Sequence, residues 1–185
     1  MDEERREWLR KALETAFNGQ VEDQNVRLKR ALVKLAQSDA ESDQSQAIDE
    51  IDACADYPDC CDNFAKLDGI TISINFLQKP GNLKSRFLSV LSLYVANNPH
   101  VQLAAWEGGL LRQLLEICSE QFSDSDLPLR AVGALGAVVR GVDALERGFI
   151  SANGRQFLQN LMTTTTDDRV QAKCQTLLDH LALID

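Results

Sequence analysis

The sequence has few of the residues that catalytic and metal sites most often use. It contains two histidines, His100 and His180, and neither lies at helical spacing from a second metal-binding side chain. It contains no GxxxxGK[ST] or GxGxxG phosphate loop and no GxSxG nucleophile elbow. We therefore expect no enzyme activity, no catalytic residue, no cofactor and no metal, and we interpret both histidines as solvated surface residues.

The cysteines also lack the spacing of a disulfide framework or a zinc site. The chain has five of them, an odd number, and no two form a CxxC pair. Cys60 and Cys61 are adjacent, which makes tetrahedral ligation of one metal by both thiolates difficult. We interpret the cysteines as core residues in a reducing compartment.

Positive charge and long apolar runs are scarce as well. The chain has 19 Lys and Arg against 28 Asp and Glu, a net charge of −9. Since phosphate binding depends on Lys and Arg, we expect neither a nucleic-acid nor a membrane partner. No window approaches the roughly 18 apolar residues of a membrane span, and MDEERREWLR lacks the apolar core of a signal peptide. We therefore expect a cytoplasmic location, with the nucleus as the alternative. The acidity favours solubility, the alternative being a basic partner.

Helix-forming residues dominate what is present. Leu and Ala are the main apolar residues, which favours helices. An amphipathic helix is predicted from Asp2 to Phe17, where Trp8, Leu13 and Phe17 share one face, and a second from Gln24 to Gln37. The acidic stretch from Ser38 to Ser45 is interpreted as a linker. We accordingly divide the chain into a helical N-terminal extension with this linker, residues 1–45, and a repeat domain, residues 46–185.

Three segments of the repeat domain share one plan, at about 57–98, 99–140 and 141–185, after a partial repeat. Each predicts a short helix ending near a glycine, a second helix ending in an apolar pair, a polar turn and a longer third helix. The glycines, Gly69, Gly108–Gly109 and Gly154, recur at about the 40 to 45 residues of armadillo and HEAT repeats. The predicted fold is all-α, an armadillo-type right-handed superhelix of three-helix repeats with an N-terminal helical cap.

The predicted third helices carry the core and the binding face. No repeat can bury its apolar stripe alone, so stacking must bury it. The stripe consists of Phe87, Leu88, Leu91, Val95, Leu129, Val132, Leu135, Val139, Val170, Cys174, Leu177 and Leu181. The glycines are assigned the sharp turns between helices, because they tolerate positive φ and close backbone approach.

A concave face lined by third helices is the usual binding surface of such folds. We therefore predict a partner-binding face from the residues that escape the core stripe. Each of them alone could be a solvated helix position, so the prediction rests on the row. They are Arg86, Ser89, Lys84, Arg130, Gly133, Ala134, Ala137, Arg140, Asp49 and Lys173.

The string MDEERREWLRKALETAFNGQ resembles the opening helix of the armadillo-type nucleotide exchange factors that bind heat-shock protein 70 chaperones, in their cytosolic branch. The resemblance continues through AIDEIDACADYPDCCDNFAKLDGI, AWEGGLLRQLLEI and LRAVGALGAVVRG. It implies a co-chaperone that binds the nucleotide-binding domain of a cytosolic heat-shock protein 70. Such a factor favours the open form of that domain and so promotes ADP release.

The resemblance also implies site residues. Arg86, Arg130 and Arg140 match basic positions of the family, and Asp59 and Phe64 match an acidic-then-aromatic pattern before the Gly69 turn. The chain departs from the family at Cys60–Cys61, at Pro128 and in ending after the third full repeat, where a further repeat is usual.

The alternative function is a general armadillo scaffold that binds an extended peptide. Scaffolds of that kind present a ladder of Asn and Trp along successive third helices. Here Asn97 and Asn98 stand at one end of a single third helix, and no Trp lies on any of them. We expect a monomer, and an exposed Trp8/Phe17 face is the alternative route to self-association.

Overall fold

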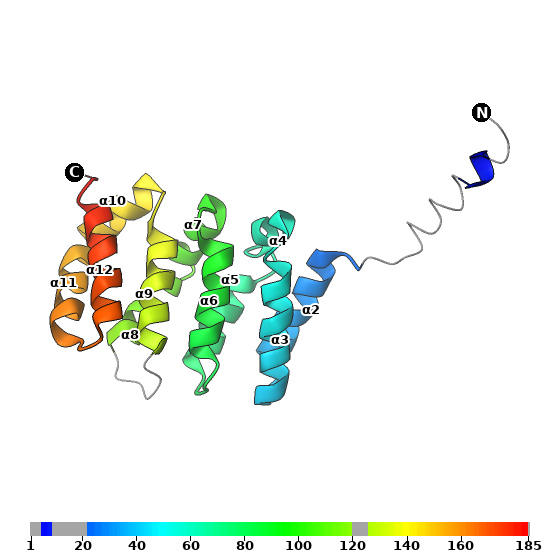
Figure 1. The fold of residues 1–185 in the computed structure, drawn as a ribbon, viewed down its shortest axis with the longest axis horizontal. Helices are drawn as coiled ribbons and strands as arrows, with labels where there is room; N and C mark the ends of the chain where they lie inside the picture. The colour runs from blue at the N-terminus through cyan, green and yellow to red at the C-terminus, as the bar shows by residue number, and fades with distance from the viewer. Residues whose placement is uncertain (1–4, 9–21, 120–125, 185) are drawn as a thin grey trace.

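The computed structural model describes residues 5–8, 22–119 and 126–184, and every regular element within these ranges is a helix (Figure 1). An incomplete set comes first: α2 (Gln24–Gln37) and α3 (Glu41–Cys54). Three sets of three follow: α4 (Pro58–Asn63), α5 (Gly69–Gln78) and α6 (Lys84–Val95); α7 (Pro99–Glu107), α8 (Leu110–Ser119) and α9 (Asp126–Val139); α10 (Asp143–Ser151), α11 (Gly154–Thr164) and α12 (Asp168–Leu181). The predicted all-helical repeat fold is confirmed.

The helices form two rows. The long third helices α3, α6, α9 and α12 stand side by side in Figure 1, each in contact with the next. Behind them α2 packs on α5, and α5 packs on α8. Helices α2 and α3 therefore take the places of the second and third helices of a repeat and cap the N-terminal side of the first full set.

The N-terminal region differs from its prediction in one place. Helix α2 has the predicted bounds, and the Asp23 carboxylate caps it by accepting a hydrogen bond of 2.9 Å from the Asn25 N–H. The predicted linker from Ser38 to Ser45 is wrong beyond Ala40, because α3 begins at Glu41. Acidic residues in a first turn interact favourably with the helix dipole, so this stretch suits a helix start. The predicted helix from Asp2 to Phe17 lies mostly outside the described residues.

The predicted core stripe is confirmed on all three third helices. Its members are buried, except Leu129, which is half-buried against the core. Helix α9 has further buried residues, Ala131, Ala134 and Val138, because α6, α8 and α12 all pack against it. Only a narrow strip of α9 is left for binding.

The turn before each second helix uses a residue with positive φ, but two of these residues are not glycines. Asp68, Gly109 and Asn153 have φ values of 62°, 88° and 63° and occupy equivalent positions. Each of their backbone N–H groups donates to the carbonyl three residues earlier. The assignment of positive φ to Gly69 and Gly154 is therefore wrong, since Asp and Asn also tolerate the left-handed region.

Gly69 and Gly154 instead provide room for a phenylalanine ring. A Cβ added at Gly69 would lie 2.7 Å from the Phe64 ring, and one at Gly154 would lie 2.4 Å from the Phe149 ring. In the middle set the equivalent buried positions hold Ala105 and Leu110. Two sets thus pair a large residue with glycine, and one pairs alanine with leucine.

A buried glutamine closes the C-terminal end of α9. Gln102 is 1% exposed, and its Nε2 donates to the carbonyl oxygens of Ala137, Val138 and Arg140 at 2.8, 3.2 and 2.7 Å. These carbonyls belong to the last turn of α9, where helix carbonyls lack intrahelical partners. Gln102 therefore ties α7 to the end of the helix that carries the binding strip.

We expect Gln102→Leu to lower the free energy of unfolding by about 1–3 kcal/mol, because it leaves buried carbonyls unpaired. Urea unfolding followed by circular dichroism measures the change. The matched control is Gln78→Leu at an exposed position, which should stay within about 0.5 kcal/mol of the parent. Equal stabilities for the two variants would show that the carbonyls do not need the amide.

His180 is not the solvated residue that its sequence context indicates. Its Nε2 lies 2.6 Å from Oε1 of Glu146, a side chain that is itself buried. The same carboxylate oxygen accepts a hydrogen bond of 2.7 Å from the Gly141 N–H. The contact joins α12 to α10, and it depends on a register between helices that the sequence alone does not reveal.

Candidate partner-binding face

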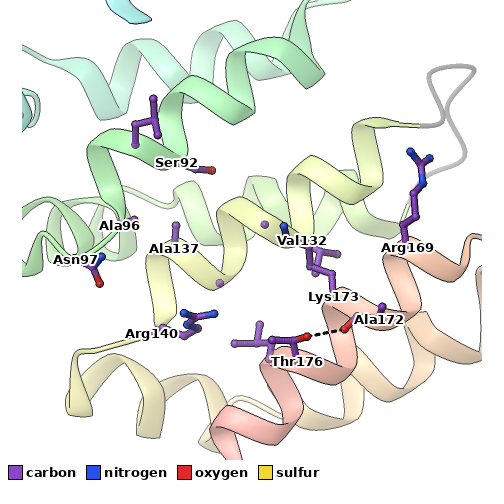
Figure 2. Close-up of a pocket in the computed structure, with 14 residues that line it drawn as sticks. Ser92, Ala96, Asn97, Val132, Ala137, Arg140, Arg169, Ala172, Lys173 and Thr176 are labelled. Atoms are coloured by element: carbon purple, nitrogen blue, oxygen red, sulfur yellow. Dashed lines mark hydrogen bonds between the residues drawn. The ribbon is translucent and has the colours of Figure 1, made fainter. Parts of the chain in front are cut away.

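A groove runs across the third helices α6, α9 and α12. Figure 2 shows Ser92, Ala96 and Asn97 on its α6 side, and Arg169, Lys173 and Thr176 on its α12 side. Helix α9 lies between them and contributes Gly133, Gly136, Ala137 and Arg140. Four predicted binding residues, Gly133, Ala137, Arg140 and Lys173, are brought together here.

The groove is cationic although the chain as a whole is acidic. Its charged lining residues are Arg140, Arg169 and Lys173, and no Asp or Glu within the described ranges lines it. Arg169 is paired with Asp126 at 2.9 Å and with Asp167 at 2.8 Å. Among the residues that the structure describes, no carboxylate pairs with Arg140 or Lys173. These two side chains keep their charge available to a partner.

Apolar and small side chains form the rest of the groove. Leu93 is 54% exposed and stands on the α6 side. Small residues from all three helices and their ends, among them Ala96 and Ala172, leave these parts of the groove without bulky side chains. A partner could therefore bring both an apolar side chain and a charged group against α9.

The predicted binding residues nearer the N-terminal end of the face lie in different surroundings. The Arg86 guanidinium on α6 forms an ion pair with Asp49 on α3 and donates a hydrogen bond of 2.9 Å to the Ser45 hydroxyl. Lys84 and Ser89 are half-buried, and the Ser89 hydroxyl donates to the Ser85 carbonyl at 3.2 Å. Of these residues, Arg86 has its charge neutralised by Asp49. Arg130 is exposed on α9 and does not line the groove.

One predicted site residue is wrong, and several groove residues were missed. Ala134 is 2% exposed and belongs to the core, so it cannot contact a partner. Ser92 and Thr176 were not predicted, although each follows a predicted residue by one helical interval of three, Ser89 and Lys173. Extending each predicted face by one turn would have found them.

None of the five cysteines forms a disulfide bond, and none lines the groove. All five are free, and four are buried, with Cys61 half-buried. Burial raises the pKa of the Cys60 and Cys174 thiols to about 11. They are therefore protonated near neutral pH, which is the state of core thiols and not of nucleophiles.

No group of three His, Cys, Asp or Glu side chains within residues 5–8, 22–119 and 126–184 is arranged to hold a metal ion. In the same ranges no helix has the length and the apolar character needed to cross a membrane.

Residues 60–184 match a protein family described as the SIL1/FES1/HPBP1 C-terminal domain. Hsp70-binding protein 1 of Rattus norvegicus is 27% identical over 194 residues, covering 98% of this chain and 54% of that protein. The Homo sapiens protein of the same name is 26% identical, covering 98% and 53%. Nucleotide exchange factor SIL1 of Xenopus laevis is 24% identical over 144 residues, covering 76% and 31%. The chain thus spans about half the length of the Hsp70-binding protein 1 relatives.

A likeness to solved structures supports the fold alone. The crystal structure of an engineered protein from the Northeast Structural Genomics Consortium superposes with a TM-score of 0.72 at 19% identity. The match covers 84% of this chain and 62% of that one.

Proposed function

Because the chain belongs to the SIL1/FES1/HPBP1 C-terminal domain family, the armadillo-type nucleotide exchange factors of Hsp70 chaperones, we propose that it is a co-chaperone. It binds the nucleotide-binding domain of an Hsp70 and promotes ADP release. The observation that supports this proposal is the groove across α6, α9 and α12, where predicted binding residues from two helices meet. Its exposed charges and apolar surface suit a protein partner, and exchange of this kind needs no catalytic group.

The proposed mechanism is a difference in affinity for two states of the chaperone. A factor that binds the open domain better than the ADP-closed domain must weaken ADP binding by the same factor by which ADP weakens its own binding. Coupling of this kind is typically about 1–3 kcal/mol, which corresponds to about 5–150-fold in affinity. Contacts made in only one of the two states have to supply that difference.

The binding face is built to keep its shape while the partner changes. The Tyr94 hydroxyl on α6 donates a hydrogen bond of 2.5 Å to the Ile51 carbonyl on α3. The Tyr94 ring stacks on Phe64 with 4.4 Å between centroids. Gln102 fixes the end of α9. A face held in this way can select one chaperone conformation without adapting to the other.

A cytosolic Hsp70 is the partner that we propose. The Hsp70-binding protein 1 relatives align over 98% of this chain, and the SIL1 relative aligns over 76%. The peptide-scaffold alternative requires an asparagine ladder along the third helices. The groove has Asn97 in the turn after α6 and no asparagine on α9 or α12, so we prefer the exchange factor.

The test is stopped-flow release of a fluorescent ADP analogue from a cytosolic Hsp70 with and without this chain. Acceleration that rises with the concentration of the chain is the expected result. Binding without acceleration would favour a scaffold that holds the chaperone, and the absence of both would refute the proposal.

Arg130→Glu is expected to weaken binding to the nucleotide-binding domain about fivefold or more, because it reverses an exposed charge beside the groove. Calorimetry measures the dissociation constant, and circular dichroism should show an unchanged helical spectrum. Lys29→Glu, at an exposed position on α2 in the other row of helices, is the matched control and should bind like the parent. If both variants bind alike, Arg130 is outside the site.

A further inference from the structure

The two glycines of α9 occupy positions that a helix would normally fill with better helix formers. Gly133 and Gly136 lie in the interior of Asp126–Val139, where glycine is unfavourable relative to alanine. Neither has positive φ, so no turn requires them. A reason for their presence has to come from what lies over them.

Each glycine has the side chain of a groove cation as its neighbour, and the approach is close only at Gly133. A Cβ added at Gly133 would lie 3.2 Å from Cε and 3.6 Å from Nζ of Lys173, which reaches across from α12. A Cβ added at Gly136 would have the Arg140 Cδ as its neighbour, at 4.0 Å. The bare backbone at Gly133 therefore lets the end of the Lys173 side chain lie low in the groove, whereas a Cβ at Gly136 would only be in ordinary contact with Arg140.

These two cations differ from Arg86 and Arg169, which also lie on the third-helix side of the molecule. Arg86 is paired with Asp49, and Arg169 is paired with Asp126 and Asp167. Arg140 and Lys173 are exposed, and in the part of the chain that the structure describes no carboxylate lines their groove. In a chain of net charge −9, an unneutralised pair of this kind attracts negative charge to the groove.

We propose that Lys173, seated over Gly133, and Arg140 form a two-cation site that binds carboxylates of an acidic segment on the protein partner. The exposed Leu93 beside the pair takes an apolar side chain of the same segment. The proposal rests on the proposed function for the identity of the partner. It adds the chemistry by which this groove recognises that partner, and it makes Gly133 a positioning residue.

Two probes test the site on the full chain: the nucleotide-binding domain of a cytosolic Hsp70, and fluorescein-labelled hexaglutamate at low salt. Arg140→Gln with Lys173→Gln is expected to weaken domain binding by about thirtyfold, as the loss of a central charge cluster does. The same variant should lose hexaglutamate binding. Lys29→Gln removes an exposed cation on α2, in the other row of helices, and is the matched control, expected to bind both probes within about twofold of the parent.

Salt provides a second measure of the same contacts. Between about 50 and about 300 mM NaCl, parent binding should weaken, since ionic strength screens exposed charges. The double variant should show a clearly flatter dependence. A dependence as steep as the parent's would place the salt-sensitive contacts elsewhere and overturn the proposal.

Gly133→Ala isolates the seating role. It should weaken both probes about threefold in the parent, because a methyl group at 3.2 Å displaces the Lys173 stem. In a Lys173→Gln background the same change should have little further effect, whereas a general disturbance of α9 would weaken binding in both backgrounds. If Gly133→Ala weakens binding equally in the two backgrounds, Gly133 does not position Lys173.

The two probes separate the two proposals. If the domain does not bind but hexaglutamate binding depends on Arg140 and Lys173, the proposed chaperone partner is wrong and the carboxylate site stands. If the domain binds and neither probe responds to the double variant, the exchange-factor proposal stands and the carboxylate site is wrong.

Discussion

Phe149→Ala is expected to lower the free energy of unfolding by about 3–5 kcal/mol, the usual cost of truncating a buried phenylalanine. The ring is buried and lies directly over Gly154, which begins α11. Its removal leaves a space bounded by the backbone of that helix. Urea unfolding followed by circular dichroism measures the loss.

The informative experiment combines this change with Gly154→Leu. Alone, Gly154→Leu should also destabilise strongly, because even a Cβ at this position would lie 2.4 Å from the Phe149 ring. The double variant recreates the pairing of Ala105 and Leu110 and should be more stable than the sum of the single changes predicts, by at least about 1 kcal/mol. Additive effects would show that the two positions do not share one space.

Leu135→Ala is expected to destabilise the fold by about 2–5 kcal/mol, because it opens a cavity in α9. Leu135 is fully buried in a helix that packs against α6, α8 and α12. The control is Leu103→Ala on α7, where the side chain is 41% exposed and less contact area is lost. Thermal unfolding should separate the two variants by several degrees. Similar melting temperatures would mean that the α9 core face has been misassigned.

Helix periodicity predicted most of the fold. Helix α2 could be predicted with its bounds because Asp23 supplies a cap and Leu28, Leu32 and Leu35 return on one face. The start of α3 could not, because an acidic stretch is equally typical of a linker and of a first helical turn. The stretch forms a helix and not a linker because Ile48 and Ile51 of α3 are buried in the core.

The binding face was predicted less completely than the core. The sequence identifies Arg140 and Lys173 as polar positions outside the apolar stripe, and the structure places both in one groove. It could not show that Arg86 is neutralised by Asp49, because that pair depends on the register between α3 and α6. Ala134 was misplaced because a third helix in a solenoid is covered on more than one side, so a single stripe understates its burial.

The Phe–Gly and Ala–Leu pairings limit how the repeats of this chain can be exchanged. A crossover from the first set to the second that falls between Phe64 and Gly69 would join Phe64 to Leu110, and two large side chains would compete for one space. The reciprocal product would join Ala105 to a glycine and leave a void. Each of the segments 64–69, 105–110 and 149–154 must therefore be kept intact. Designs that recombine or shuffle the repeats should place their junctions outside these segments.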